Sequence, residues 1–338
     1  MKSKLWHWGV GLALWGALLL VALGACRVDA QTWLAALITP TATATLTATP
    51  THTPTPTHTP TPTATATPTP VPLAIQVRAD PPQVAQAHTV AVWVTGNRPI
   101  TVTGVLSDTP LSFVVAGPDG VACWAVAGIN FYAAGGPRPI RVTARDDLGR
   151  EASQTIAITV TTASYPIEHV QLVPGRGSLL KPDIIRKERA RIEPIYAEVA
   201  PSVLWTGMFT RPITTVITSQ FGVRRSYNGG PPGGYHGGVD FRGAVGHPVR
   251  AAAAGRVVLA EELYLRGTMI IIDHGMGVHT GYAHLSELKV QAGDVVEPGQ
   301  VIGLVGDTGL VSGSHLHWEI RIAGVTVDPL EWTERAFP

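Results

Sequence analysis

The chain has 338 residues, of which 45% are hydrophobic and 14% are charged, and its formal net charge is +1 at pH 7. This length allows two folded domains and a tether. The balanced charge and the lack of a phosphate-binding glycine loop or other nucleic-acid motif argue against a nucleic-acid partner. Only Cys26 and Cys123 occur, which excludes a fold held together by a disulfide framework.

Residues 1–26 have the pattern of an export signal. Lys2 and Lys4 precede an uncharged apolar stretch that ends in Leu23-Gly24-Ala25-Cys26. Small residues before a cysteine resemble a bacterial lipobox, and Cys26 would then be lipidated and become the mature N-terminus. The alternative is an uncleaved membrane anchor, for which roughly 17 apolar residues are at the short end. Both interpretations predict an extracytoplasmic protein that is tethered to the cytoplasmic membrane.

Residues 27–72 form the predicted tether. From Thr39 to Pro72 the chain is almost entirely threonine, proline and alanine. Frequent proline prevents helix and ladder hydrogen bonds, and too little apolar surface is present to pack. We therefore predict an extended linker with a reach on the order of 100 Å.

Residues 73–162 are predicted to form a separate β domain. Short runs rich in β-branched residues occur at 74–77, 89–94, 100–102, 140–144 and 155–160. Asp146-Asp147-Leu148-Gly149 predicts a hairpin turn between the last two runs. Several short strands in such a length favour an immunoglobulin-like β-sandwich. Cys123 lies in an apolar run and is expected to be buried and inert. The domain is either a binding module or a spacer.

A connecting segment at 163–206 contains the one helix that the sequence predicts, at 182–200. Apolar residues recur at helical spacing along one face, and charged residues cover the other. The apolar face comprises Ile185, Ile192, Ile195, Tyr196 and Val199, and the charged face comprises Arg186, Lys187, Glu188, Arg189, Arg191 and Glu193. Pro194 is expected to kink or split this helix.

The last region, 207–338, is predicted to be a β-rich unit. Runs at 248–260, 269–273, 277–283 and 300–305 are rich in valine and isoleucine and are separated by Gly, Pro and Asp. This pattern predicts a compact antiparallel sheet with tight turns. Arg224, Arg225 and Tyr227 precede a glycine-rich loop and either flank a substrate groove or form a solvated basic face.

Five residues of this region have the types and spacings of a zinc site: His236, Asp240, His284, His315 and His317. Zinc binds imidazole nitrogen and carboxylate oxygen, and a catalytic site uses three protein ligands and leaves one position open. Residues around His315-Leu316-His317 alternate with the period of a strand. Because residues two apart on a strand share a face, both rings should point into one site.

The surrounding motifs resemble a known family. They are Thr218-Ser219-Gln220-Phe221-Gly222, Gly233-Gly234-Tyr235-His236-Gly237-Gly238-Val239-Asp240, Gly281-Tyr282-Ala283-His284-Leu285, Gly299-Gln300-Val301-Ile302-Gly303 and Ser314-His315-Leu316-His317-Trp318-Glu319. In this order they make the region from about Gly207 to Trp332 similar to the catalytic domain of the lysostaphin-type, or LytM-like, zinc metallopeptidases.

The resemblance implies a role for each of the five residues. His236, Asp240 and His317 would bind Zn²⁺, and His284 and His315 would act on the attacking water and the developing oxyanion. It also implies a β-rich fold with an open groove, and an endopeptidase that cuts peptide bonds in the stem peptides or cross-bridges of peptidoglycan. The alternative is a zinc-binding protein that does not cleave and instead regulates or activates another cell-wall hydrolase. The scissile bond, the oligomeric state and the division of roles between His284 and His315 stay open.

Overall fold

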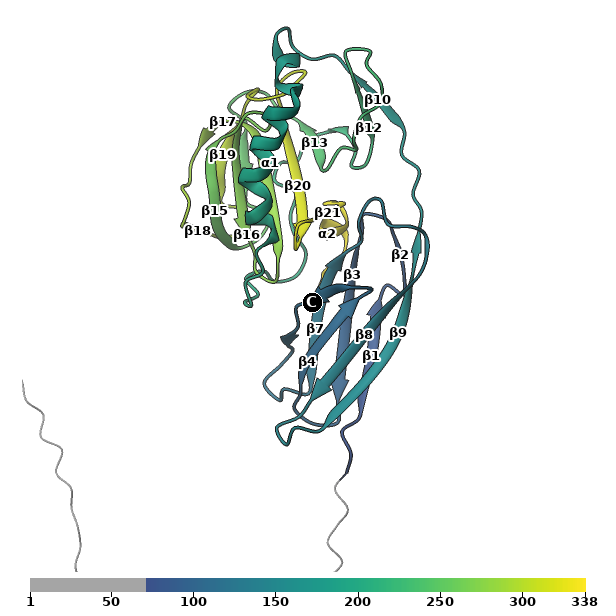
Figure 1. The fold of residues 1–338 in the computed structure, drawn as a ribbon. Helices are drawn as coiled ribbons and strands as arrows, with labels where there is room; N and C mark the ends of the chain where they lie inside the picture. Colours follow the sequence, from purple (N-terminus) through teal and green to yellow (C-terminus); the bar gives the residue numbers. More distant parts are fainter. Residues whose placement is uncertain (1–70) are drawn as a thin grey trace, which may run out of the picture. The chain divides into compact units, whose positions relative to one another are not determined.

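The computed structural model describes residues 71–338, which are mainly β, as the sequence predicts (Figure 1). The predicted export segment at 1–26 and nearly all of the tether at 27–72 lie outside the described residues. Within 71–338, no helix has the length and apolar character needed to cross a membrane.

The first β region consists of two sheets. One sheet has the order β1-β3-β7-β6 and the other has the order β2-β9-β8-β4-β5. The first sheet comprises β1 (Ile75–Asp80), β3 (Thr89–Gly96), β7 (Ala122–Gly128) and β6 (Val114–Val115); the second comprises β2 (Gln83–Ala85), β9 (Glu151–Thr161), β8 (Gly136–Arg145), β4 (Thr101–Leu106) and β5 (Thr109–Leu111). Both sheets contribute side chains to one hydrophobic core.

The turn predicted at Asp146 joins β8 to β9. The Asp146 carboxylate accepts hydrogen bonds from the backbone N–H groups of Leu148 and Arg150, which is how aspartate stabilises such turns. Cys123 is buried, as predicted, and burial raises the pKa of its thiol.

The connecting segment contains β10 (Ile167–Val170), the short 3-10 helix η1 (Arg176–Leu180) and α1 (Pro182–Ala197). α1 ends three residues before the predicted end at Ala200, and it continues through Pro194 without splitting. Glu188, which the sequence places on the charged face of this helix, is 1% exposed. Its side chain is buried because it accepts hydrogen bonds from the backbone of Leu265 and from the guanidinium of Arg266.

The last region is built on a ten-stranded sheet with the central order β11-β13-β20-β17-β16-β15-β18. These strands are β11 (Ile217–Ser219), β13 (Val239–Arg242), β20 (His315–Ile322), β17 (Val278–Leu288), β16 (Thr268–Asp273), β15 (Gly255–Glu262) and β18 (Val295–Val296). Off this path, β14 (Pro248–Arg250) pairs with β19 (Val301–Val305), β19 also pairs with β17, and β21 (Val325–Val327) pairs with β20. The apolar run at 248–260 therefore forms two strands and not one.

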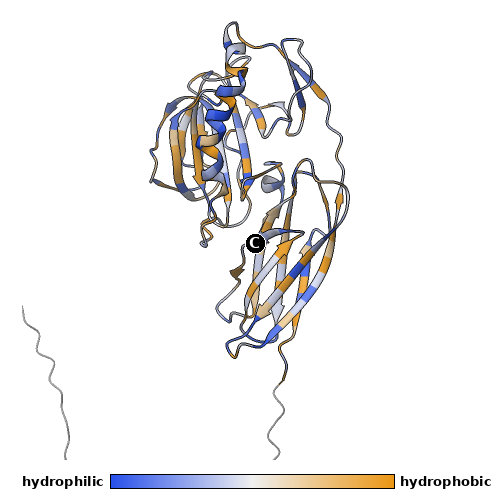
Figure 2. Cartoon of the chain, viewed as in Figure 1, coloured by the Kyte–Doolittle hydropathy of each residue, from blue (hydrophilic) through white to orange (hydrophobic). Residues whose placement is uncertain are grey.

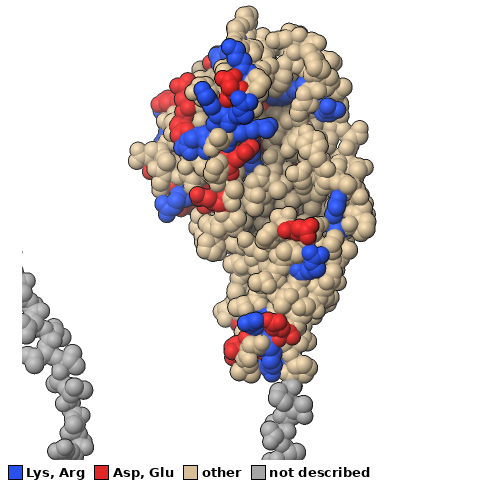
Figure 3. All heavy atoms as spheres, viewed as in Figure 1, with Lys and Arg blue, Asp and Glu red and all other residues tan. Residues whose placement is uncertain are grey.

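Both faces of this sheet are covered. One face carries Ile270, Tyr282 and Trp318 into the largest hydrophobic core. On the other face, Ile192 and Tyr196 of α1 pack against Leu259, Met269, Ile271 and Ala283. Figure 2 shows hydrophobic residues concentrated on the strands and hydrophilic residues along α1, and Figure 3 shows charged side chains gathered over the same helix.

The two β regions share packing and hydrogen bonds. Trp124 of β7 contacts Trp205, and Trp205 contacts Trp332 of the short C-terminal helix α2 (Glu331–Glu334). The indole N–H of Trp332 donates to Thr89 Oγ1, and the backbone N–H of Thr89 donates to the Glu331 carboxylate. These contacts join β3 directly to the C-terminal residues.

Candidate active site

Three neighbouring strands bring the five predicted site residues together. In the antiparallel register, Asp240 of β13 lies opposite His317 of β20, and His317 lies opposite Ala283 of β17. His236 precedes β13, and its backbone N–H donates to Val223 O. His284 follows Ala283 with a positive φ of 63°, a conformation in the left-handed region that non-glycine residues seldom adopt.

Three ligand atoms converge at one point. His236 Nε2, His317 Nδ1 and Asp240 Oδ1 form a triangle in which each side is 2.9 Å. All three residues are buried. Zinc binds such atoms at about 2.0–2.2 Å, so tetrahedral ligands lie about 3.3 Å apart and these side chains need to separate by only a few tenths of an ångström. The donor set and its spacing therefore fit a zinc ion.

The remaining nitrogen of each ligand ring has its own partner, which fixes the tautomer. His236 Nδ1 lies 2.9 Å from Gln220 O, so its N–H donates there and leaves the Nε2 lone pair for a metal. His317 Nε2 lies 3.3 Å from Glu319 Oε2, which leaves the Nδ1 lone pair. Partners of this kind orient metal-binding histidines and raise their basicity.

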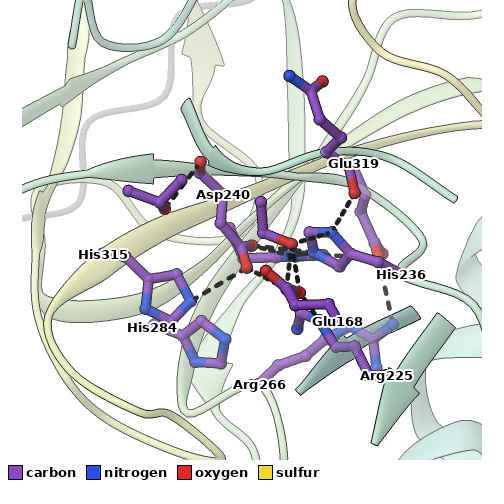
Figure 4. A network of polar contacts seen from close by, with 12 residues as sticks. Glu168, Arg225, His236, Asp240, Arg266, His284, His315 and Glu319 are labelled. Atoms are coloured by element: carbon purple, nitrogen blue, oxygen red, sulfur yellow. Dashed lines mark hydrogen bonds and ion pairs between the residues drawn. The ribbon is translucent and has the colours of Figure 1, made fainter. Parts of the chain in front are cut away.

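Asp240 is held ionised by its neighbours. Burial by itself would raise its pKa, but His236 and the Arg225 guanidinium outweigh burial and hold the pKa of this carboxyl well below its usual range. Arg225 donates to Asp240 Oδ2, and its Nε lies 3.3 Å from the carboxylate of Glu168 (Figure 4). Glu168 also accepts a 2.8 Å hydrogen bond from Ser219. The connecting segment thus reaches the site through Glu168.

His284 and His315 lie next to each other beside the triangle, with ring centroids 4.7 Å apart (Figure 4). In both rings Nδ1 lies within hydrogen-bond distance of a carbonyl, Thr308 O at 2.9 Å and Gly313 O at 2.8 Å. Each Nε2 is therefore the free nitrogen. His315 Nε2 is buried without a hydrogen-bond partner in the described chain and lies 3.7 Å from Asp240 Oδ2. Burial and the neighbouring rings of His315 and His317 hold the pKa of His284 well below its ordinary value.

A polar cavity of about 240 Å³ opens beside these side chains. Asp240, His315 and Arg225 line it, and the connecting segment contributes Glu168 and Leu172. Further along, the same segment contacts the loop between β19 and β20, where Arg176 donates to Gly309 O and Asp307 O. The space beside the site therefore has walls from both the sheet region and the connecting segment.

The structure brings all five predicted residues into one cluster and places Arg225 and Tyr227 along the cavity. Sequence reasoning gave no role to Glu168 or Glu319. A signal for Glu319 was present, because the two-residue period that pairs His315 with His317 also puts Glu319 on their face of β20. No comparable signal marked Glu168, which lies far from the motifs in the chain.

Comparison with known proteins agrees with this geometry. Residues 234–329 match the profile of peptidase family M23, a segment that includes all five site residues. This segment is a peptidase family M23 domain. The resemblance to LytM-like peptidoglycan endopeptidases that the motifs indicated is thereby confirmed.

The relatives of the M23 domain include named wall enzymes. The chain is 37% identical over 115 residues to the peptidoglycan DD-endopeptidase ShyA of Vibrio cholerae, covering 34% of this chain and 27% of that protein. It is 43% identical over 95 residues to the DD-carboxypeptidase/endopeptidase Mpg of Neisseria meningitidis, covering 28% of this chain and 22% of that protein. The chain thus spans about a quarter of the length of these curated relatives.

The similarity to a solved structure extends beyond the M23 domain. A peptidase M23 protein from Pseudomonas aeruginosa is 26% identical, with a TM-score of 0.52, and the match covers 70% of this chain and 88% of that one. The match therefore includes part of the chain that precedes residue 234.

Proposed function

We propose that this protein is a zinc-dependent endopeptidase that hydrolyses peptide bonds in the stem peptides or cross-bridges of peptidoglycan. One observation carries the proposal. Three ligand atoms, from His236, Asp240 and His317, converge at one point, and two further imidazoles lie beside them with Nε2 free. The names of the relatives of the M23 domain support the substrate class.

The residues supply proton transfer and orientation. Zinc, when bound by His236, Asp240 and His317, would polarise the scissile carbonyl and make the attacking water more acidic. His284 is neutral because its pKa is lowered, so its Nε2 can accept a proton from that water. His315 Nε2, which has no partner in the described chain, faces the same space, and as an imidazolium this ring would donate its Nε2–H to negative charge as it develops.

The cavity supports an extended peptide as the substrate. It is open and lined by polar groups of Ser219, Arg225, Arg242 and Ser314. Backbone and side-chain groups of this kind bind a peptide main chain through hydrogen bonds.

The decisive experiment is digestion of purified peptidoglycan by the zinc-loaded full-length protein. Mass spectrometry should identify new peptide termini, and these should disappear when a chelator is added and return with zinc. The His284→Ala variant serves as the matched control, because it keeps all three proposed ligands. Zinc binding without cleavage of several wall types would favour the non-cleaving regulator.

We further propose that residues 73–162 are an immunoglobulin-like module. The strand order β1-β3-β7-β6 corresponds to the ABED sheet of that fold, and β9-β8-β4 corresponds to its second sheet, GFC. A binding assay with purified wall fragments would distinguish a binding module from a spacer.

We also propose that the protein works outside the cytoplasmic membrane, anchored through a lipidated Cys26 and the linker that follows it. The support is the sequence of residues 1–26 and the Thr/Pro composition after Thr39. Cys26→Ala should release the protein from the membrane fraction if the cysteine is lipidated. An unchanged membrane fraction would favour an uncleaved anchor.

A further inference from the structure

A helix outside the M23 match reaches the proposed metal site through buried polar groups. α1 precedes the matched segment, 234–329, by more than thirty residues. Among its residues, Glu188, Ile192 and Tyr196 are buried. Ile192 packs in an apolar cluster. Glu188 accepts hydrogen bonds from Leu265 and Arg266 in the turn between β15 and β16, and Tyr196 donates one to Glu319 of β20.

Glu319 is the point where the helix and the metal site meet. Its side chain is 1% exposed and lies two residues after His317 on the same face of β20. Glu319 Oε2 lies 3.3 Å from His317 Nε2, and Oε1 accepts a 2.7 Å hydrogen bond from the Tyr196 hydroxyl. Arg266 and Arg321 approach the same carboxylate at 3.2 Å and 3.4 Å. One oxygen of Glu319 is thus bonded to the ligand His317, and the other is bonded to Tyr196 of α1.

The second buried group of α1 holds one of these arginines. Glu188 Oε1 accepts a 3.0 Å hydrogen bond from Arg266 Nη1, while Nη2 of the same guanidinium reaches Glu319. Arg266 therefore bridges a carboxylate of the helix and a carboxylate of the sheet. A buried charge is costly unless it is paired, so these four charged side chains, Glu188, Arg266, Glu319 and Arg321, depend on one another.

The strand next to β20 leaves room for this arrangement. Gly281 of β17 lies opposite Glu319 in the register. A Cβ at this position would lie 2.4 Å from the Tyr196 hydroxyl oxygen and 2.8 Å from Glu319 Cγ. Both distances are too short for non-bonded atoms, so a side chain at residue 281 would push the hydroxyl away from the carboxylate.

We propose that Glu319 is a positioning residue for the metal ligand His317, and that Tyr196 and Glu188 make α1 a structural part of the metal site. The inference rests on the proposed zinc-binding function. Glu319 accepts the Nε2–H of His317 and so holds the ring with Nδ1 directed at Asp240 and His236. Tyr196 and Arg266 hold the carboxylate in turn, and Glu188 holds Arg266. The metal affinity of the M23 domain therefore depends on a helix that precedes it.

The test measures the zinc dissociation constant of the full-length protein by competition with a chelator. Glu319→Gln should weaken zinc binding by roughly 10- to 100-fold, the range typical of groups that hydrogen-bond a metal ligand. Tyr196→Phe keeps the ring and all charges and removes one hydrogen bond to a charged group, so we expect a weakening of about threefold or more. The visible spectrum of the cobalt-substituted protein should shift in both variants because the ligand geometry changes.

Two matched variants separate positioning from general destabilisation. Tyr282→Phe removes a buried hydroxyl that bonds to Ala252 N and lies outside this network, and Glu193→Gln changes an exposed carboxylate on α1. Both should keep the wild-type zinc affinity and cobalt spectrum. If Glu319→Gln does not fold, Tyr196→Phe decides the question. Wild-type affinity in both folded test variants would overturn the inference and leave the proposed function intact, whereas a wild-type protein that binds no zinc would overturn both.

Discussion

Two pairs of long antiparallel strands in this protein carry their polar residues differently. In the pair β8 and β9 of the first β region, buried residues such as Ile140, Val142 and Ile158 alternate with exposed ones. In the pair β17 and β20, successive residues from Val278 to Leu285 and from Leu316 to Ile320 are buried, so both faces are covered. One face is mainly apolar, and the other carries His317, Glu319 and His279.

These two strand pairs differ in how many polar side chains they bury, and burying such groups lowers the free energy of unfolding unless they are paired. A buried polar group destabilises a fold unless it is hydrogen-bonded, and a buried charge needs a partner. Among residues 71–338, the buried polar and charged side chains of the first β region are Thr89 and Asp146, while eleven others belong to α1 and to the last region, 207–338. In the first region these two side chains have structural roles, Asp146 in a turn and Thr89 in the contact with Trp332. The last region keeps buried polar groups that packing does not need, and these include the side chains of the proposed active site.

The largest effect should come from removing a metal ligand. We expect His236→Ala or His317→Ala to weaken zinc binding by more than about 100-fold, beyond the range typical of outer groups, and to abolish peptidoglycan cleavage. Metal analysis after dialysis and the digestion assay measure the two effects. His247→Ala, which changes an exposed histidine, is the control. Full zinc retention in either ligand variant would refute the ligand assignment.

A smaller effect on binding, with a large effect on turnover, should follow from changing the two neighbouring imidazoles. We expect His284→Ala and His315→Ala to retain zinc while turnover falls by roughly 100-fold or more, the contribution that general acid–base catalysis supplies. The kinetics of both variants would also show which ring matters more. Wild-type turnover in both would eliminate the proposed catalytic roles.

The same contrast explains which features of the fold and of the site could be predicted from the sequence. Local patterns predicted the β class and the clustering of His315 with His317, because a strand alternates faces every two residues. The buried state of Glu188 was not predictable in this way. Its helical neighbours are charged, and the partners that compensate its burial, Leu265 and Arg266, lie 77 and 78 residues away in the chain. Glu168 was missed for the same reason, since its contact with Arg225 depends on the pairing of β10 with β12 (Arg224–Tyr227).

A buried histidine of the last region, outside the proposed active site, should make the free energy of unfolding depend on pH. His274 is fully buried between Ala254 O and Thr280 Oγ1, and burial lowers its pKa to about 4. An unfolded histidine titrates near 6.5, so acid protonates the unfolded chain first. The stabilisation is complete above about pH 6.5 and is lost as the pH falls to about 4, at up to roughly 1.4 kcal/mol per pH unit.

Urea unfolding of wild type and His274→Gln between pH 4.5 and 7 would measure this contribution. The free energy of unfolding should fall more steeply with acid in the wild type than in the variant. The other buried histidines are present in both proteins, so the difference between the two slopes isolates His274. Equal slopes would show that His274 does not titrate as its burial requires.

The smallest effect should come from a polar group of the first region, where we expect a change in stability without a change in the metal site. Thr89→Val keeps the shape of the side chain but removes the oxygen that accepts the indole N–H of buried Trp332. Leaving that donor unpaired should lower the free energy of unfolding by about 1–3 kcal/mol. Thr101→Val, at an exposed threonine of β4, should cost less than about 0.5 kcal/mol.

Chelator competition should give the same zinc affinity for both variants and the wild type, because Thr89 contacts neither the ligands nor Glu319. A weakened zinc affinity in Thr89→Val would mean that the two β regions are coupled at the metal site, and the distinction between them would no longer hold.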